Sequence, residues 1–356
     1  MHRLIAVGAT LTTLAGCAGE RHPSTRKTET SATIVTVREV YQTERDTLLD
    51  IDSPAVWHGP NGEHWMLVTA KQGDIIRVAD ASTGRTLRDV GGSGSEPGRF
   101  ERPNGIAVID SLLFVVERDN ARVQVMTLPD FRPIGIYGTP ELIKPYGVAV
   151  RQQSPGVYET WITDSYELVE DQVPPDSALG RRVRQYRVSL AGGTIETALV
   201  ATFGDTAGAG VLRVVESIAV DPPSDRLMIA EELEGESQIK AYTLAGRFTG
   251  ATIPASYFPN QAEGIVLFAC ADGGGLWITT DQGKVTNTFH LFDRRSLDHR
   301  GSFQSPTILN TDGIALTQVP FPGFPAGALF AVHDDGGVAA ISWEAIAGAL
   351  GLPMRC

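Results

Sequence analysis

Six polar residues in this chain each stand at the start of a short apolar run, and four of the six are carboxylates. The phrase is a polar residue followed by a small residue and an apolar stretch, as in Asn104-Gly105-Ile106-Ala107-Val108. In chain order the polar positions are Asp52, Asn104, Tyr146, Glu216, Glu263 and Asp312. Oxygen ligands without clustered histidine or cysteine suit hard cations, and calcium accepts irregular sets of them better than magnesium does. The sequence therefore predicts a calcium site, provided that the fold brings these positions together.

The regular recurrence of this sequence phrase indicates a fold that would bring the six positions together. The phrases recur at intervals of about 40 to 70 residues, and a second strand-like run such as Leu113-Phe114-Val115-Val116 follows each one. Glycine, proline and aspartate clusters separate the runs, which is typical of all-β proteins. A radial repeat of this kind predicts a six-bladed β-propeller over residues 46–356, one blade per copy. We expect a short helix over residues 342–349 to close it, packing Trp343 and Ile346 against the last blade.

In a propeller the six positions would meet at one end of the central channel. The first strand of each blade lines the channel and the second runs antiparallel beside it, so the ends of the second strands should reach the same rim. Those ends supply Lys71, Arg118, Asp164-Ser165, Glu231-Glu232, Asp281-Gln282 and His333-Asp334-Asp335. Carboxylates gathered at one mouth repel one another unless they are protonated, paired or bound to a cation. Lys71 and Arg118, expected opposite the acids, would complete a cradle for a phosphate group.

Each of these residues taken alone also has an ordinary structural explanation. Acids at strand starts commonly accept hydrogen bonds from turn amides, and a lone tyrosine such as Tyr146 is commonly a packed side chain. Lys71 or Arg118 would by itself be solvated or salt-bridged. His333 is the one histidine expected near the rim, and we do not assign it as a general acid. The interpretation as a site depends on the shared rim.

The start of the chain has the pattern of an export signal. A short basic start leads into an apolar core over residues 4–14 that is too short to span a bilayer, and Leu14-Ala15-Gly16-Cys17 follows. This ending resembles the lipobox of bacterial lipoproteins, which implies removal of residues 1–16 and lipidation of Cys17. An ordinary signal peptide with an incidental cysteine is the alternative. Residues 17–45 are polar and predict a flexible, disordered tether.

The resemblance to lipoproteins implies an exported chain that the lipid on Cys17 anchors to a membrane. Ala18 favours the outer membrane, facing the periplasm or the cell surface. The net charge of −12, with Arg181-Arg182-Arg184 as the one tight basic cluster, argues against nucleic acid as a partner, and we expect a monomer. Cys270 and Cys356 can pair in an oxidising compartment, but the sequence does not show whether they are close.

The propeller positions resemble those of the β-propeller phytases, which are six-bladed, calcium-dependent enzymes that remove phosphates from myo-inositol hexakisphosphate. Asp52-Ser53-Pro54-Ala55-Val56-Trp57 is similar to the opening Asp-Asp-Pro-Ala-Ile-Trp of that family. The likeness continues at Thr69-Ala70-Lys71, Glu216 with Ala230-Glu231-Glu232, Glu263-Gly264 with Gln282-Gly283, Thr311-Asp312-Gly313-Ile314, Leu329-Phe330-Ala331-Val332-His333-Asp334-Asp335-Gly336 and Trp343-Glu344-Ala345-Ile346-Ala347. It covers residues 46–352 and is densest towards the end.

This resemblance implies a function and a set of site residues. It implies a calcium-dependent phosphomonoester hydrolase like a 3-phytase, acting on myo-inositol hexakisphosphate or a related phosphorylated small molecule. The implied calcium ligands are Asp52, Glu216, Glu232, Glu263, Gln282 and Asp312, with Asp334 as a further candidate. Lys71 and Arg118 would bind phosphate, Tyr146 would lie beside them, and Glu263 would belong to the active site. The rate would come from electrostatic stabilisation, with no covalent intermediate required.

The sequence departs from the family pattern at four positions. These are Ser53, Ala107 and Gln261, each where the family has an acid, and Ser165, where it has a phosphate-binding lysine. Each departure lowers the charge available to calcium or phosphate, so activity on phytate is an open question.

Two other functions therefore stay open. Residues 91–108 and 117–125 resemble an NHL-type propeller repeat, and such propellers are usually binding modules, so a non-catalytic, surface-anchored propeller is one alternative. A metal-dependent sugar-lactone hydrolase with a single metal and a carboxylate base is the other. Calcium-dependent phosphate release would select the phosphatase, and lactone turnover without phosphate release would select the lactone hydrolase.

Overall fold

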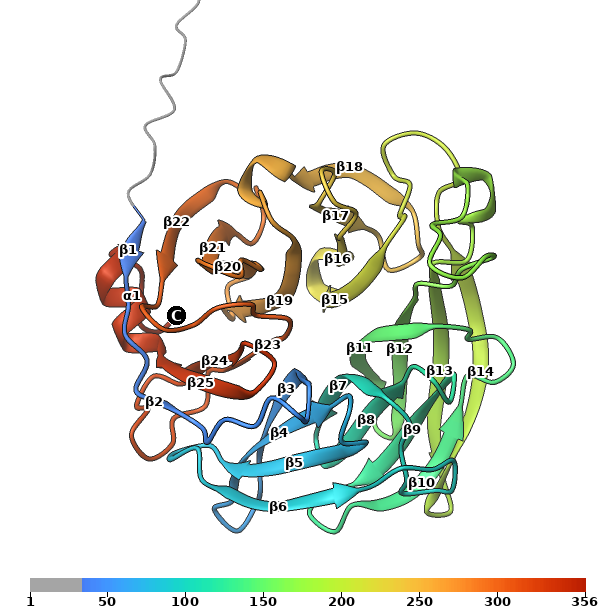
Figure 1. Ribbon diagram of the computed structural model, residues 1–356, viewed down its shortest axis with the longest axis horizontal. Coiled ribbons are helices and arrows are strands. Elements are labelled where there is room, and N and C mark those ends of the chain that lie inside the picture. Colours follow the sequence, from blue (N-terminus) through green and yellow to red (C-terminus); the bar gives the residue numbers. More distant parts are fainter. Residues whose placement is uncertain (1–33) are drawn as a thin grey trace, which may run out of the picture. The chain divides into compact units, whose positions relative to one another are not determined.

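The computed structural model describes residues 34–356, and they form six β-sheets arranged radially (Figure 1). The prediction of an all-β, six-bladed propeller is confirmed. The predicted signal peptide and the lipidation site at Cys17 lie outside the described residues. Within these residues, no helix has the length and apolar character needed to cross a membrane.

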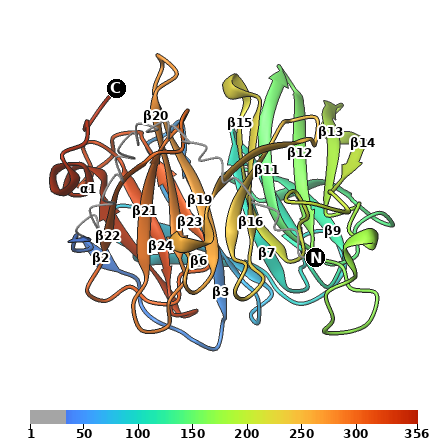
Figure 2. The ribbon, with the colours of Figure 1, turned by 90° about the horizontal axis from the view of Figure 1, so that it is seen from above.

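Each blade is a meander that starts at the channel and moves outward. The first blade holds β3 (Ile51–His58), β4 (His64–Ala70), β5 (Ile75–Asp80) and β6 (Thr86–Gly91). The second blade holds β7 (Pro103–Ile109), β8 (Leu112–Glu117), β9 (Arg122–Thr127) and β10 (Arg132–Tyr137). The third blade holds β11 (Pro145–Ser154), β12 (Val157–Asp164), β13 (Val183–Ala191) and β14 (Thr194–Phe203). The fourth and fifth are β15 (Val215–Asp221), β16 (Arg226–Glu231), β17 (Gln238–Tyr242) and β18 (Phe248–Ile253); and β19 (Ala262–Ala269), β20 (Gly275–Asp281), β21 (Thr288–Asp293) and β22 (His299–Gln304). The sixth holds β23 (Ile314–Thr317), β24 (Ala328–His333) and β25 (Gly337–Ser342). Figure 2 shows the strands running between the two faces of the ring.

The N-terminal segment completes the last two blades. β2 (Tyr41–Gln42) pairs antiparallel with β25, and β1 (Val35–Thr36) pairs parallel with β22. Val37, only 3 % exposed, packs into the core of the fifth and sixth blades. The predicted tether over residues 17–45 was therefore wrong at its C-terminal end. The few apolar side chains there are enough, because sheet edges that already exist supply the hydrogen-bond partners.

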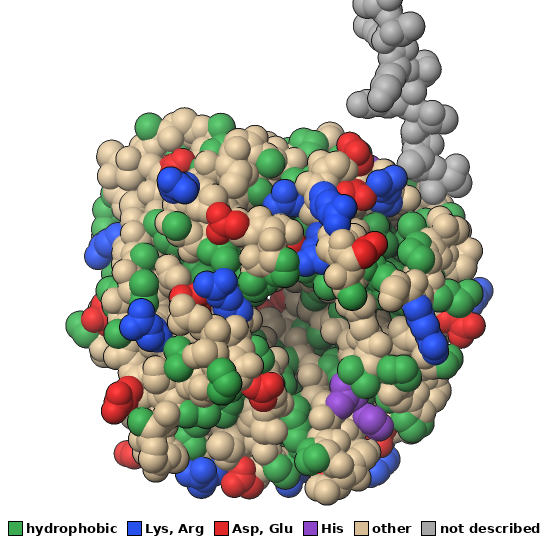
Figure 3. Space-filling model, turned by 180° about the vertical axis from the view of Figure 1, so that it is seen from behind, with side chains coloured by type: hydrophobic (Ala, Val, Ile, Leu, Met, Phe, Trp, Pro, Cys, Tyr) green, Lys and Arg blue, Asp and Glu red, His purple; other side chains and the backbone are tan. Residues whose placement is uncertain are grey.

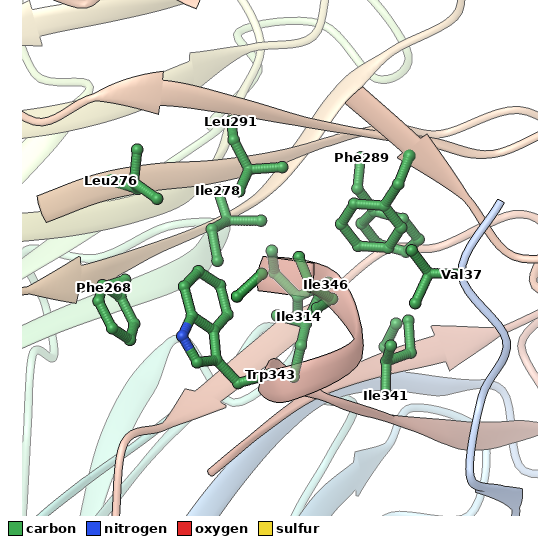
Figure 4. Packing of buried hydrophobic residues seen from close by; sticks show 14 of the residues in the cluster. Val37, Phe268, Leu276, Ile278, Phe289, Leu291, Ile314, Ile341, Trp343 and Ile346 are labelled. Atoms are coloured by element: carbon green, nitrogen blue, oxygen red, sulfur yellow. The ribbon is translucent and has the colours of Figure 1, made fainter. Parts of the chain in front are cut away.

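The predicted closing helix is present, and a disulfide fixes the C-terminal tail that follows it. α1 (Trp343–Leu350) follows β25, and it begins and ends one position later than the predicted residues 342–349. The Trp343 ring stacks on Phe268 at a centroid distance of 4.1 Å, within the apolar cluster of Figure 4. Cys356 is bonded to Cys270, which follows β19, so the C-terminal tail is fixed to the fifth blade. Three short 3-10 turns, Asp176–Ala178, Pro222–Ser224 and Ala255–Tyr257, lie in the connecting loops.

The central channel is lined by the six innermost strands. A cavity of about 290 Å³ is bounded by small and apolar side chains such as Ala55, Val108, Ile218, Val266 and Leu316. Figure 3, which shows the ring from behind, reveals a hollow at its centre. This largely apolar cavity adjoins the polar end of the channel, because Ser53, Gly105, Gly147 and Ser217 line both.

Candidate functional site

The six phrase positions come together at one end of the channel, as the sequence predicted. A small cavity of about 30 Å³ is lined by Asp52, Asn104, Tyr146, Glu216, Glu263 and Asp312. Five of these residues lie where the pairing of the first and second strands shifts register, as between Val215 and Ile218. At each shift two residues face one residue of the partner strand, which is a β-bulge. A bulge re-aims a side chain, so it explains why polar groups enter an otherwise apolar channel.

Hydrogen bonds between blades hold these positions. The Thr69 hydroxyl of β4 donates to the carbonyl of Asn104 in the next blade at 2.6 Å. At the ring seam the Gly313 amide donates to the carbonyl of Asp52 at 3.0 Å. The carbonyl of Asp312 accepts from the Gly264 amide, also at 3.0 Å. The rim backbone is thus fixed by neighbouring blades.

Three glutamates form the most concentrated part of the site, and we call them the glutamate triad: Glu216, Glu232 and Glu263. One carboxylate oxygen from each lies within 4.8 Å of the other two. Glu232 and Glu263 are 3 % and 5 % exposed, and Glu232 Oε1 has no hydrogen-bond partner. In the described range 34–356 this is the one such group of three or more potential metal-binding side chains.

The triad is electrostatically unfavourable without a cation. Burial raises the pKa of Glu216 to about 8, with Asp52 and Asp312 adding to the effect. Burial, and after it the charge of Glu216, raise the pKa values of Glu232 and Glu263 well above the ordinary range. Crowded, poorly solvated carboxylates retain protons unless positive charge is brought to them.

The aspartates on the other side of the mouth are paired with a lysine. Lys71 Nζ lies 3.1 Å from Asp312 Oδ2, 3.3 Å from Asp50 Oδ1 and 3.4 Å from Asp52 Oδ1. Lys71 was expected opposite the acids, but it lies among them. Asp50, which the sequence analysis did not select, joins the group because it immediately precedes β3 at the same rim.

The remaining predicted residues have separate positions. Arg118 Nη1 lies 3.4 Å from the Tyr146 hydroxyl, and Arg118 Nε donates to Asp119 at 2.7 Å. Burial raises the pKa of Tyr146 to about 12, so its hydroxyl stays protonated at neutral pH. The Gln282 amide donates to Asp312 and therefore orients an acid of the rim.

Asp334 does not line the mouth. Its side chain, 41 % exposed, is paired with Arg45. Asp335 is the closer acid: it accepts a hydrogen bond from Asn310 at 2.9 Å and raises the pKa of Asp312 after the larger effects of burial, Lys71 and Asp52. Adjacent aspartates of a turn point in different directions, and no local pattern indicates which one faces the mouth.

Several acids at the ends of the second strands accept hydrogen bonds from backbone amides, which is the structural explanation that the sequence analysis gave as the alternative. Asp164 accepts from the amide of Lys144 at 2.8 Å, Glu231 from the amide of Val214 at 2.9 Å, and Asp281 from the amide of Asn260 at 2.9 Å. These buried acids hold the loops that lead into the next blade, so they are unavailable as cation ligands. The Ser165 hydroxyl accepts from the Val215 amide at 3.2 Å, and His333 Nδ1 from the Leu309 amide at 3.3 Å.

Two depressions flank the mouth. One of about 240 Å³ is lined by Tyr146, Glu216, Lys144 and Arg213, among others. Two positively charged side chains of this depression form ion pairs: Lys144 is paired with Glu167 at 2.5 Å, and Arg213 with Asp176 at 2.9 Å. The other depression, of about 530 Å³, is lined by residues that include the amide side chains Asn260, Gln261 and Gln282 and the ammonium of Lys284. A substrate reaching the mouth would meet polar groups on both sides.

The triad fits a hard divalent cation. Its donors are all oxygens, and a calcium ion at about 2.4 Å from each of three oxygens matches oxygens that lie within 4.8 Å of one another. The unpartnered Glu232 Oε1 and the unpartnered Asn104 Oδ1 are buried acceptors that such an ion or its waters would satisfy.

Comparison with known proteins assigns this chain to no family. No protein-family model and no curated protein sequence matches this chain. One solved structure that matches is that of a catalytically inactive virginiamycin B lyase from Staphylococcus aureus with quinupristin. It is 11% identical with a TM-score of 0.48, and the match covers 85% of this chain and 98% of that chain. A likeness at this identity concerns the fold alone.

Proposed function

We propose that this chain is a calcium-dependent phosphomonoester hydrolase whose active site is the acidic channel mouth. The observation that carries the proposal is the glutamate triad, because a bound cation would stabilise three closely spaced carboxylates of which two are buried and one has an unpartnered oxygen. Four of the acids that the family resemblance assigns to the site, Asp52, Glu216, Glu263 and Asp312, line one cavity together with Tyr146, which supports the same function.

The residues of the mouth would have three different roles: binding the cation, binding the phosphate and positioning Asp312. Calcium, when bound by Glu216, Glu232 and Glu263, would neutralise phosphate charge and polarise the bond to phosphorus. Arg118 and the protonated Tyr146, 3.4 Å apart, offer N–H and O–H donors to the phosphate oxygens. Gln282 and Lys71 hold Asp312 in place from either side. The substrate class is a phosphorylated small molecule, of which myo-inositol phosphates are the example that the family resemblance suggests.

The test is phosphate release from myo-inositol hexakisphosphate by the purified protein, with calcium and with a chelator. We expect release only with calcium, and a loss of about 100-fold or more in kcat for Glu263→Gln. Glu170→Gln, an exposed glutamate outside the site, is the matched control and should retain activity. Release in the presence of chelator, or full activity of Glu263→Gln, would contradict the proposal.

A sugar-lactone hydrolase is the second candidate, and one observation favours it. The described residues offer one triad, and a single metal with a nearby carboxylate base is the arrangement expected of such an enzyme. Proton release from a sugar lactone, measured beside phosphate release on the same protein, distinguishes the two. Calcium binding without either reaction would instead support a binding module.

The location of the protein belongs to the proposal as well. We infer an exported monomer held at the outer membrane by lipid on Cys17, so that the mouth meets substrates outside the cytoplasm. Metabolic labelling with a fatty acid, lost in Cys17→Ser, tests the anchor.

A further inference from the structure

The acids of the mouth are divided into two unlike halves. The glutamate triad comes from the fourth and fifth blades and contains no cation. Asp50 and Asp52 of the first blade and Asp312 of the sixth surround Lys71 Nζ. The first and sixth blades are neighbours at the seam where the ring closes, since β3 and β23 lie side by side.

We propose that Lys71 is a resident cation that fills the aspartate half of the mouth, so that the protein binds one exchangeable divalent cation, at the triad. The count of one rests on the proposed function, whereas the role of Lys71 stands on its own contacts. Lys71 would then be a positioning residue that fixes Asp52 and Asp312.

The contacts of Lys71 are those of a bound ion. Its side chain is 14 % exposed, and its ammonium group has three N–H donors for the three carboxylates, at 3.1 to 3.4 Å. No other positively charged side chain among the described residues is within ion-pair distance of these aspartates.

The ammonium group of Lys71 should occupy the site among the three aspartates in preference to a free cation. Lys71 follows β4 directly, and the Lys71 amide donates to the carbonyl of Asp50 at 2.8 Å, so its backbone is fixed beside the acids. The side chain therefore competes with free ions at a high effective concentration. Removal of its charge would leave three carboxylates, with Asp335 nearby, in one buried place, and a divalent cation would then be favoured there.

The first experiment counts bound calcium by isothermal titration of the whole protein. We expect one ion per chain for the wild type and for the charge-retaining Lys71→Arg, and two for Lys71→Met. Lys144→Met is the matched control, because Lys144 lies near the same mouth in a pair with Glu167, and it should bind one. The same number for Lys71→Met and the wild type would overturn the proposal.

The second experiment needs no variant and covers the case in which Lys71→Met fails to fold. An amine-acylating reagent is applied to the wild type with calcium and with chelator, and labelling is read by mass spectrometry. We expect Lys71 to react about tenfold or more slowly than the exposed Lys284 in both conditions, because burial and pairing withhold its amine. Labelling of Lys71 that rises to the level of Lys284 on adding calcium would show that calcium displaces it, and would overturn the proposal.

The two proposals fail in different ways. A wild type that binds no calcium, beside a Lys71→Met variant that binds one ion, would refute the calcium-dependent hydrolase while supporting the role of Lys71. One ion in both proteins would leave the triad site intact and refute the role of Lys71.

Discussion

The Thr163 hydroxyl of β12 donates a 2.6 Å hydrogen bond to the backbone carbonyl of Glu216, in the next blade, and accepts one of 2.7 Å from the Gly147 amide. One side chain thus fixes the bulge of its own blade and the position of a triad glutamate in the neighbouring blade. The precision of the mouth depends on contacts of this kind, since its groups come from several different blades.

Thr163→Val should therefore lower stability and cation affinity together. The change keeps the volume of the side chain but leaves a partly buried N–H and a partly buried C=O without this partner, at a cost of about 2 kcal/mol. Denaturant unfolding measures the first effect and calcium titration the second. Thr279→Val is the control, because the Thr279 hydroxyl is equally buried and has no partner, so its loss should be neutral. Equal effects of the two changes would contradict this role of Thr163.

Glu232→Gln should abolish the stabilisation by calcium. Calcium present at about 100 times its Kd would stabilise the native state by about 2.7 kcal/mol. The Glu232→Gln change removes the charge of a calcium-binding side chain that is almost fully buried. Its melting temperature without calcium should rise or stay unchanged, because one member of a repelling group becomes neutral. Thermal unfolding with calcium and with chelator measures both; a wild-type calcium shift in Glu232→Gln would argue against the triad as the site.

The sequence predicted the site better than it predicted how its charges pair. A polar residue before an apolar run fixes a channel position, because the strand period decides which side chains face inward, and all six such positions line the mouth. Whether Lys71 faces the acids or lies among them depends on a side-chain rotamer and on the distance between the first and sixth blades. No local pattern carries that information, and the same holds for Asp335 in place of Asp334.

The strands β1 and β2 escaped prediction for a different reason. Each has two residues, which is too short for any periodicity to show. Their position follows from edges on β22 and β25 that exist only after the rest of the ring has formed. The closing helix, with its apolar spacing local to one segment, was predictable to within one residue.

A chain that starts at residue 46 should be less stable than one that starts at residue 34. The longer chain keeps backbone hydrogen bonds such as Val37 to Gln304 at 2.9 Å and Val40 to Ala340 at 2.7 Å. With Val37 also buried, we expect a loss of about 3 kcal/mol or more and some self-association through the bared edges. Melting curves and size-exclusion chromatography measure the two effects; identical behaviour of the two chains would show that the closure is dispensable.

The disulfide between Cys270 and Cys356 should stabilise the closed ring. It links residues 86 positions apart, and its removal in Cys356→Ser should cost about 2–4 kcal/mol. Unfolding of the wild type with and without a reductant gives the same comparison. The doubly substituted Cys270→Ser/Cys356→Ser protein is the control, and its stability should not respond to reductant.

The contribution of His290 to stability should fall as the pH drops from about 6.5 towards 4, opposite in sign to the contribution of the rim acids, whose pKa values are raised. Burial, with His299 adding to it, lowers the pKa of His290 to about 4, whereas the unfolded chain protonates this residue near its ordinary value of 6.5. Because the unfolded state binds the proton first, the contribution of His290 to stability falls by about 2 kcal/mol between pH 8 and pH 5. The difference in stability between the wild type and His290→Gln should change by this amount over the interval. An unchanged pH dependence in that variant would show that other groups cause it.

The way the ring closes has a consequence for the newly made chain. β1 and β2 are synthesised first, yet their partners β22 and β25 are synthesised last, so the first segment has nothing to pair with until translation is almost complete. A chain released before residue 342 leaves the sixth blade unfinished and the seam open. A chain without β22 or β25 would therefore keep exposed strand edges, which proteases and chaperones can bind.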